Sequence, residues 1–179
     1  MNTVQPIRDR SKLAELKKLL RENSYRDYML FVLGINVGMR VGDILRLRVC
    51  NVQGVHIAIS EEKTGKNRLF LISPQLRQEL DAYIKEKLPD DLLFPGRYLD
   101  RPLTRQQAYN ILSNAAGKLG LEMIGTHTMR KTFGYWHYKT HKDVALLQTI
   151  FNHASSSVTL RYIGIAQDEI DQSVSQMFL

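Results

Sequence analysis

Two short β-rich runs interrupt a sequence that otherwise has helical periodicity. Residues 55–59 and 68–72 are rich in Val, Ile, Leu and Phe, and the segment between them supplies Gly65 and Asn67, residue types that turns favour. The pattern predicts a β-hairpin with a basic tip, and residues 49–52 are the candidate for a short third strand. The expected fold is therefore mainly α with a small antiparallel β-sheet, an α+β class.

Helical patterns flank the hairpin on both sides. Ser73 and Pro74 predict an N-cap followed by the first residue of a helix, and Thr104 with Gln107 has the spacing of a capping box. The helices expected from these signals and from apolar periodicity lie at about 10–22, 25–37, 41–48, 74–88, 104–119, 128–139, 143–151, 156–163 and 167–176.

Composition limits the class of protein and its partners. The chain has 179 residues, enough for one domain with a core, and carries 25 Lys plus Arg against 18 acidic residues, a formal charge of +7. This excess favours a polyanionic partner such as DNA. The single cysteine, Cys50, excludes an intramolecular disulfide and is expected to be a small buried residue. The longest apolar stretch, residues 29–35, is too short to span a bilayer, so we expect a cytoplasmic protein without membrane contacts.

The second half of the chain gathers groups that could act on a phosphodiester. His127 and Arg130 are three residues apart and would share one face of a helix, and His153 and Tyr162 follow. A guanidinium can hold two phosphate oxygens, an imidazole can move a proton near neutral pH, and a phenol can act as a nucleophile. In isolation Tyr162 would most simply be a packing tyrosine. Asn152 is expected to end the preceding helix in the left-handed conformation and so to aim His153.

Four ordered segments resemble the tyrosine recombinase (phage integrase) family. The resemblance covers about residues 10 to 165, and it is specific because all four segments occur in the family's order. Lys131 stands where many relatives carry His, and Asn152 stands where Gly is common. The matching segments are residues 36–47 with Arg40, 63–66 with Lys63, 126–133 with His127 and Arg130, and 152–162 with His153 and Tyr162.

The resemblance implies a role for each of these residues. Tyr162 is similar to the nucleophile that forms a 3′-phosphotyrosyl bond with DNA, and Arg40 and Arg130 are similar to the pair that holds the non-bridging phosphate oxygens. His153 would donate to the same phosphate, and His127 would assist proton transfer at the tyrosine. Asp43 is expected to orient this region. The implied catalytic set is Arg40, Lys63, His127, Arg130, His153 and Tyr162.

Two lysines compete for the part of general acid. Lys63 resembles the hairpin lysine that protonates the leaving 5′ oxygen, and it directly precedes Thr64 and Gly65 as in the family segment. Lys66 lies on the same hairpin tip and could deliver an ammonium group as well. The family chemistry implies no cofactor, no metal and no ATP, because the phosphotyrosyl bond keeps the energy of the broken bond.

The ends of the chain suggest its organisation. Family members usually carry an N-terminal helical domain, and the matching region here begins near residue 10. We therefore expect a single catalytic domain over residues 1–179 without a core-binding domain, either as a fragment or as a short stand-alone member of the family. The tail, about residues 167–179, could fold back on its own domain or dock into a neighbouring subunit of a homo-tetramer on DNA. Its apolar residues are Ile170, Val174, Met177, Phe178 and Leu179.

Three functions agree with these observations. The first is a site-specific DNA recombinase or integrase of a phage or other mobile genetic element, bacterial or phage-encoded. The second is a non-catalytic DNA-binding module that keeps the fold, which the full set of six competent catalytic positions disfavours. The third is an enzyme similar to type IB topoisomerases, which would religate the same strand, and the closeness of the four segments to the recombinase pattern disfavours it.

Overall fold

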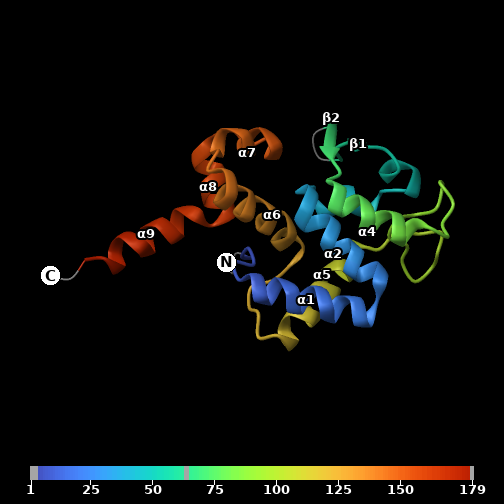
Figure 1. The fold of residues 1–179 in the computed structure, drawn as a ribbon, viewed down its shortest axis with the longest axis horizontal. Coiled ribbons are helices and arrows are strands. Elements are labelled where there is room, and N and C mark those ends of the chain that lie inside the picture. Colours follow the sequence, from blue (N-terminus) through green and yellow to red (C-terminus); the bar gives the residue numbers. More distant parts are fainter. Residues whose placement is uncertain (1–3, 63–64, 178–179) are drawn as a thin grey trace.

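The computed structural model describes residues 4–62 and 65–177 and has a mainly helical fold with one hairpin (Figure 1). The predicted fold class is confirmed. The elements in these ranges are α1 (Arg10–Asn23), α2 (Tyr25–Val37), α3 (Val41–Leu45), a 3₁₀ helix (Val49–Val52), β1 (His56–Ser60), β2 (Asn67–Leu71), α4 (Pro74–Ile84), α5 (Arg105–Lys118), α6 (Thr126–His141), α7 (Val144–Phe151), α8 (Ser156–Ile163) and α9 (Ile165–Ser175).

The hairpin forms where the sequence places it. β1 and β2 are antiparallel, with His56 opposite Leu71 and Ser60 opposite Asn67. The predicted third strand at residues 49–52 is wrong, since this segment is a 3₁₀ helix. The amide of Arg48 donates to the Asn51 side chain at 2.8 Å, and this local bond favours a turn over an extended strand.

Two predicted helices are shorter than expected. α3 ends at Leu45 rather than near residue 48, because the carbonyl of Leu47 accepts a hydrogen bond from the amide of Leu93 in the loop after α4. α4 ends at Ile84 rather than near residue 88, where the Asp91 side chain accepts from the amide of Leu88 instead. In both places a contact with a distant or following loop replaces a helical bond, which periodicity cannot reveal.

The buried apolar residues form two separate clusters. The larger one, which we call the large core, is built around α2 and extends from Ile7 through α1, α3, the hairpin, α4 and α5 to Met129. The smaller one, the small core, lies under α7 and α8. Among the described residues its buried members are Tyr135, Leu147, Phe151, Ile163 and Ile165.

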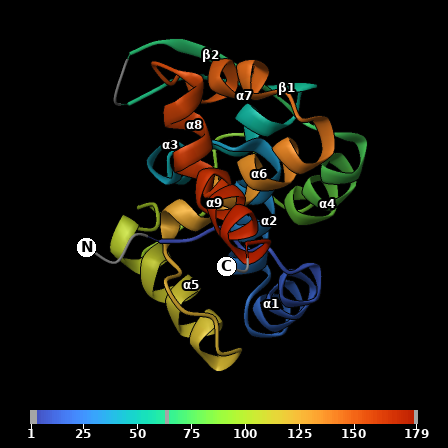
Figure 2. The ribbon, with the colours of Figure 1, turned by 90° about the vertical axis from the view of Figure 1, so that its left-hand side faces the viewer.

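α6 runs between the two cores and contributes to both, through Met129 on one side and Tyr135 on the other. α7 lies beside the hairpin (Figure 2), where the Arg68 guanidinium of β2 donates to the Ile150 carbonyl at 2.8 Å. The small core is therefore connected to the rest of the molecule mainly through α6 and the hairpin.

The segment before α1 crosses α6 and contacts α9. The amide of Ile7 donates to the Thr132 hydroxyl at 2.9 Å, and Trp136 Nε1 donates to the carbonyl of Ile7 at 3.0 Å. Arg8 forms an ion pair with Asp168 of α9 at 3.1 Å. Beyond this pair α9 extends away from the body of the molecule (Figure 1).

Two remaining sequence expectations concern the burial of Cys50 and the apolar residues of the tail. Cys50 was expected to be buried, and this is wrong, because the 3₁₀ helix turns its side chain toward solvent. In the tail, Val174 and Met177 are 62% and 64% exposed, whereas the Ile170 side chain and residues 178–179 lie outside the described parts. No helix within the described ranges is long and apolar enough to cross a membrane.

Candidate active site

Four helices, α3, α6, α7 and α8, bring the candidate residues to one place beside the hairpin. Arg40 is the N-cap of α3, and His127 and Arg130 lie in the first two turns of α6. His153 follows α7, and Tyr162 is near the end of α8. The described members of the predicted set are therefore brought together, although they come from both ends of the sequence.

Arg130 is the buried centre of this group. It is 4% exposed, and its two terminal nitrogens donate to the carbonyls of Gly38, at 2.6 Å, and Phe151, at 2.9 Å. Its guanidinium carbon also lies 4.4 Å from the centre of the Phe151 ring. Burial lowers the pKa of Arg130 to about 10, so it keeps its charge at neutral pH. Arg130 thus joins the end of α2 to the end of α7.

Gly38 makes this bond possible. It ends α2 with a φ of +66°, a left-handed conformation that glycine adopts without strain, and a side chain here would collide with the ring of Phe133. The glycine in the first arginine segment therefore turns its carbonyl toward Arg130 and lets α6 approach closely.

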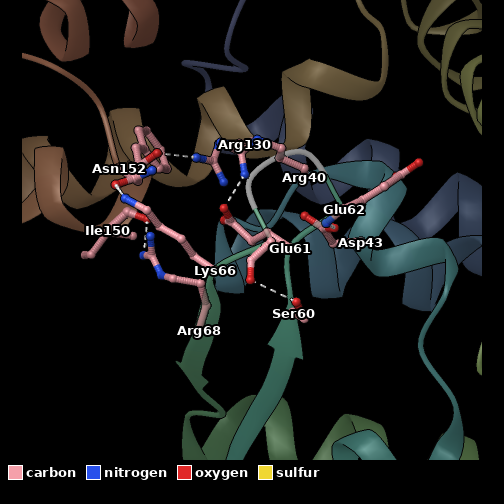
Figure 3. A network of polar contacts seen from close by, with 12 residues as sticks. Arg40, Asp43, Ser60, Glu61, Glu62, Lys66, Arg68, Arg130, Ile150 and Asn152 are labelled. Atoms are coloured by element: carbon pink, nitrogen blue, oxygen red, sulfur yellow. Dashed lines mark hydrogen bonds and ion pairs between the residues drawn. The ribbon is translucent and has the colours of Figure 1, made fainter.

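Arg40 lies at the edge of a cavity next to Arg130. Its side chain is 24% exposed, and its Nη1 atom lies 2.7 Å from a carboxylate oxygen of Glu61 (Figure 3). The cavity has a volume of about 440 Å³, and Arg40, Arg105 and His127 are among the residues that line it. Two carboxylates, those of Asp43 and Glu62, also line it, so basic and acidic groups share the walls of this cavity.

Tyr162 lies against His127 and in the field of both guanidinium groups. Its hydroxyl is 3.4 Å from His127 Nδ1. Burial raises the pKa of Tyr162, and the charges of Arg130 and Arg40 partly oppose this rise. Its ring packs edge-on against Phe151 and His153, with ring centres 5.5 Å and 5.1 Å apart. The phenol is therefore protonated at neutral pH and is held by packing on one side.

His153 is aimed by the turn that precedes it, as predicted. Asn152 ends α7 in the left-handed conformation, with φ 53° and ψ 48°. His153 Nδ1 lies 3.1 Å from the Thr159 hydroxyl, which orients the ring. Burial lowers the pKa of His153, and the charges of Arg130 and Arg40 lower it further. Without a bound anion, His153 is therefore mostly neutral at neutral pH.

The hairpin delivers the remaining basic groups. Lys63 and Thr64 lie outside the described residues, so the preferred general acid is not placed. Lys66 is described, and its Nζ atom lies 3.4 Å from the side-chain oxygen of Asn152 (Figure 3). The hairpin tip therefore reaches the turn that carries His153.

Sequence reasoning missed two contributors to this site. Arg68 donates to the carbonyls of Thr149 and Ile150 and so ties the hairpin to α7. Glu61 is 2% exposed, an unusual burial for a carboxylate. The alternation of β2 could have shown that Arg68 and Phe70 share a face. Nothing in the local sequence around Glu61 indicates its burial.

Asp43 behaves as expected. It is 4% exposed, and its carboxylate accepts from the amide of Glu62 at 2.9 Å and from the Arg46 side chain at 3.0 Å. It therefore supports the base of the hairpin from the α3 side.

No cluster of three or more His, Cys, Asp or Glu residues suited to a metal ion occurs in the ranges 4–62 and 65–177.

Comparison with known proteins agrees with this geometry. The sequence matches the phage integrase family over residues 9–169. It is 48% identical over 169 residues to the probable integrase/recombinase YoeC of Bacillus subtilis (strain 168), covering 94% of this chain and 93% of YoeC. It is 25% identical over 174 residues to the tyrosine recombinase XerD of Staphylococcus haemolyticus (strain JCSC1435), covering 92% of this chain and 59% of XerD.

The fold is also that of solved recombinases. The crystal structure of the XerH site-specific recombinase, bound to a palindromic difH substrate in a post-cleavage complex, superimposes with a TM-score of 0.75 at 20% identity. The match covers 98% of this chain and 54% of XerH, so the chain spans about half of that protein. Sequence match, fold and the gathered basic groups lead to one conclusion: this chain belongs to the phage integrase family and has the fold of a tyrosine recombinase catalytic domain.

Proposed function

We propose that residues 1–179 act as a catalytic domain that cuts and rejoins double-stranded DNA through Tyr162. The phenolic oxygen attacks the phosphorus of one phosphodiester, the bond from phosphorus to the 5′ oxygen breaks, and a 3′-phosphotyrosyl bond and a free 5′ hydroxyl result. Attack by a 5′ hydroxyl on the phosphotyrosyl bond reverses the step and restores the phosphodiester. The observation that carries this proposal is the Tyr162 hydroxyl beside His127, in the field of Arg130 and Arg40.

The first proton to move is that of the phenol. Because burial keeps the pKa of Tyr162 high, the nucleophile needs a base at the moment of attack, and His127 Nδ1 at 3.4 Å is placed to take the proton. Arg40 and Arg130 hold the non-bridging oxygens, where negative charge grows as the fifth bond to phosphorus forms. The same two charges favour the phenolate.

The second proton goes to the leaving 5′ oxygen. Lys63 at the hairpin tip supplies it, with Lys66 as the alternative donor. His153 is mostly neutral before DNA binds, and an incoming phosphate raises its proton affinity, so it donates a hydrogen bond to a non-bridging oxygen. The contact between Lys66 and Asn152 supports this assignment, because it brings the hairpin tip to the turn that carries His153.

Trapping of the covalent intermediate tests the chemistry. The full chain is incubated with DNA that carries a nick close to the cleaved bond. After cleavage the short piece that carries the free 5′ hydroxyl dissociates, so the phosphotyrosyl bond cannot be rejoined. An adduct that survives denaturing gels should form with or without a chelator. Tyr162→Phe should abolish the adduct while DNA binding and thermal unfolding remain close to those of the unchanged protein. An adduct that persists in Tyr162→Phe, or one that disappears with the chelator, would rule out the assigned mechanism.

We further propose that the tail couples subunits of a homo-tetramer on DNA. α9 extends from the body and exposes Val174 and Met177, so these apolar side chains are accessible to a neighbouring subunit (Figure 1). Truncation after Gln167 should preserve adduct formation and abolish assembly of higher complexes in gel-shift experiments. Assembly that is unchanged by the truncation would exclude this role of the tail.

A further inference from the structure

A buried carboxylate lies where an anionic substrate should bind. Glu61 follows the last residue of β1 and is 2% exposed, and one of its carboxylate oxygens is 2.7 Å from Arg40 Nη1. Burial of a charge is costly unless the charge is paired, and a negative charge here also repels a phosphate. Its presence therefore calls for a role that outweighs the repulsion.

The backbone of Glu61 closes the neck of the hairpin. Its amide donates to the carbonyl of Lys66 at 3.0 Å, and its carbonyl accepts from the amide of Gly65 at 2.8 Å. The next residue, Glu62, is held through its amide by the buried carboxylate of Asp43. Glu61 is therefore fixed on the neck, and its side chain connects the neck to Arg40.

The contact with Arg40 is an ion pair without the alignment of a hydrogen bond. Arg40 Nη1 is buried, and among the described residues no acceptor is aligned with its N–H groups. Charge attraction therefore holds the buried Nη1 end of the guanidinium near Glu61. Such an arrangement fixes the position of the fork, and the exposed part of the Arg40 side chain lines the cavity where the phosphate is expected.

We propose that Glu61 is a positioning residue for strand cleavage, which holds the Arg40 guanidinium and ties it to the hairpin that carries the general acid. This inference rests on the proposed function of the site. Arg40 and the leaving-group lysine then share one support, so phosphate binding and protonation of the leaving oxygen occur in a common geometry. The charge of Glu61 carries this role, since attraction rather than an aligned hydrogen bond holds Arg40.

Replacement of the charge alone tests the idea. With nicked DNA at saturation, Glu61→Gln should slow single-turnover adduct formation by about tenfold, with little change in the DNA concentration for half-maximal rate. The same change is then made in the Arg40→Lys variant, which completes a double-mutant cycle. If Glu61 acts through Arg40, Glu61→Gln should slow the reaction of the Arg40→Lys variant by less than about twofold. Asp81→Asn, which breaks the Arg77–Asp81 ion pair on α4 at 2.9 Å, is the matched control and should leave the rate unchanged.

Two results would overturn the proposal. A faster reaction in Glu61→Gln would show that the carboxylate only competes with the phosphate. An equal loss in the unchanged and Arg40→Lys backgrounds would show that Glu61 supports the fold and not Arg40.

A second measurement does not depend on DNA cleavage. In nitrogen-detected NMR spectra of the free protein, rotation of the Arg40 guanidinium should be slow, with separate signals for its two terminal nitrogens, and Glu61→Gln should merge them. The signals of Arg130, which is held by two carbonyls, serve as the internal reference. Separate Arg40 signals in Glu61→Gln would refute the positioning role, and failure of the unchanged protein to form an adduct would instead refute the proposed function.

Discussion

The large core and the small core hold different parts of the site, and the large core contains many more buried apolar side chains. The large core places Arg40 and the hairpin among helices α1 to α5. The small core places Tyr162 and His153 over the buried side chains of α6 to α8 and Ile165. Since buried apolar area supplies most of the stability of a fold, Tyr162, the proposed nucleophile, is on the part that is expected to open more easily. Arg40 and the hairpin can thus stay fixed while Tyr162 and His153 move together.

The same Phe→Ala replacement should cause a loss of global stability in the large core and a local opening in the small core. Phe31 in the large core is 1% exposed and Phe151 in the small core is fully buried. Replacement of a buried Phe by Ala costs roughly 3–5 kcal/mol. Phe31→Ala should lower the free energy of global unfolding by that amount. Phe151→Ala should instead open α7 and α8 locally, seen as faster hydrogen exchange there with little change in α1 and α2. Exchange that rises equally in all four helices would contradict the division into two cores.

Arg130 is a direct link between the cores, and its removal should be the next most damaging change. Arg130→Ala leaves the carbonyls of Gly38 and Phe151 without their donor, at a cost of about 2–4 kcal/mol in the free energy of unfolding by urea. Arg130→Lys keeps the charge but reaches one carbonyl at a time, so it should recover part of the stability and little of the cleavage rate. Equal stability of Arg130→Ala and the unchanged protein would show that the two carbonyls do not depend on Arg130.

Acid should weaken the small core first, with the smallest effect of the three. Burial lowers the folded-state pKa of both His153 and His137 below the ordinary value of 6.5. The unfolded chain then binds protons more readily than the folded chain, so stability falls as the pH drops below 6.5. His153→Asn should reduce the fall in Tm between about pH 7.5 and about pH 5.5, and His137→Asn should remove a further part. A fall in Tm that is identical in both variants and the unchanged protein would exclude these imidazoles as its source.

The sequence predicted the parts of the molecule whose signals are local. The hairpin, the N-caps at Ser73 and Thr104, and the left-handed turn at Asn152 follow from short-range rules, and the structure confirms them. The gathering of His127 and Tyr162 followed from the family resemblance, and the structure places them 3.4 Å apart.

Two of the failures involve contacts between distant segments: the end of α3 depends on Leu93, and the carboxylate of Glu61 is paired with Arg40 from another element. The end of α4 and the failed third strand depend on local side-chain bonds instead. None of these leaves a periodic pattern. The catalytic roles themselves stay predictions, including that of Lys63, which lies outside the described residues.

The ion pair between Arg8 and Asp168 gives the chain an unusual path for mechanical load. Residues 5–8, which lie before the first residue of α1 in the sequence, make contacts with Met123, Thr132 and Asp168. A force applied to residue 4 would therefore reach α6 and α9 before it reached α1. A tether attached at residue 4 would therefore pull on α9, near the other end of the sequence.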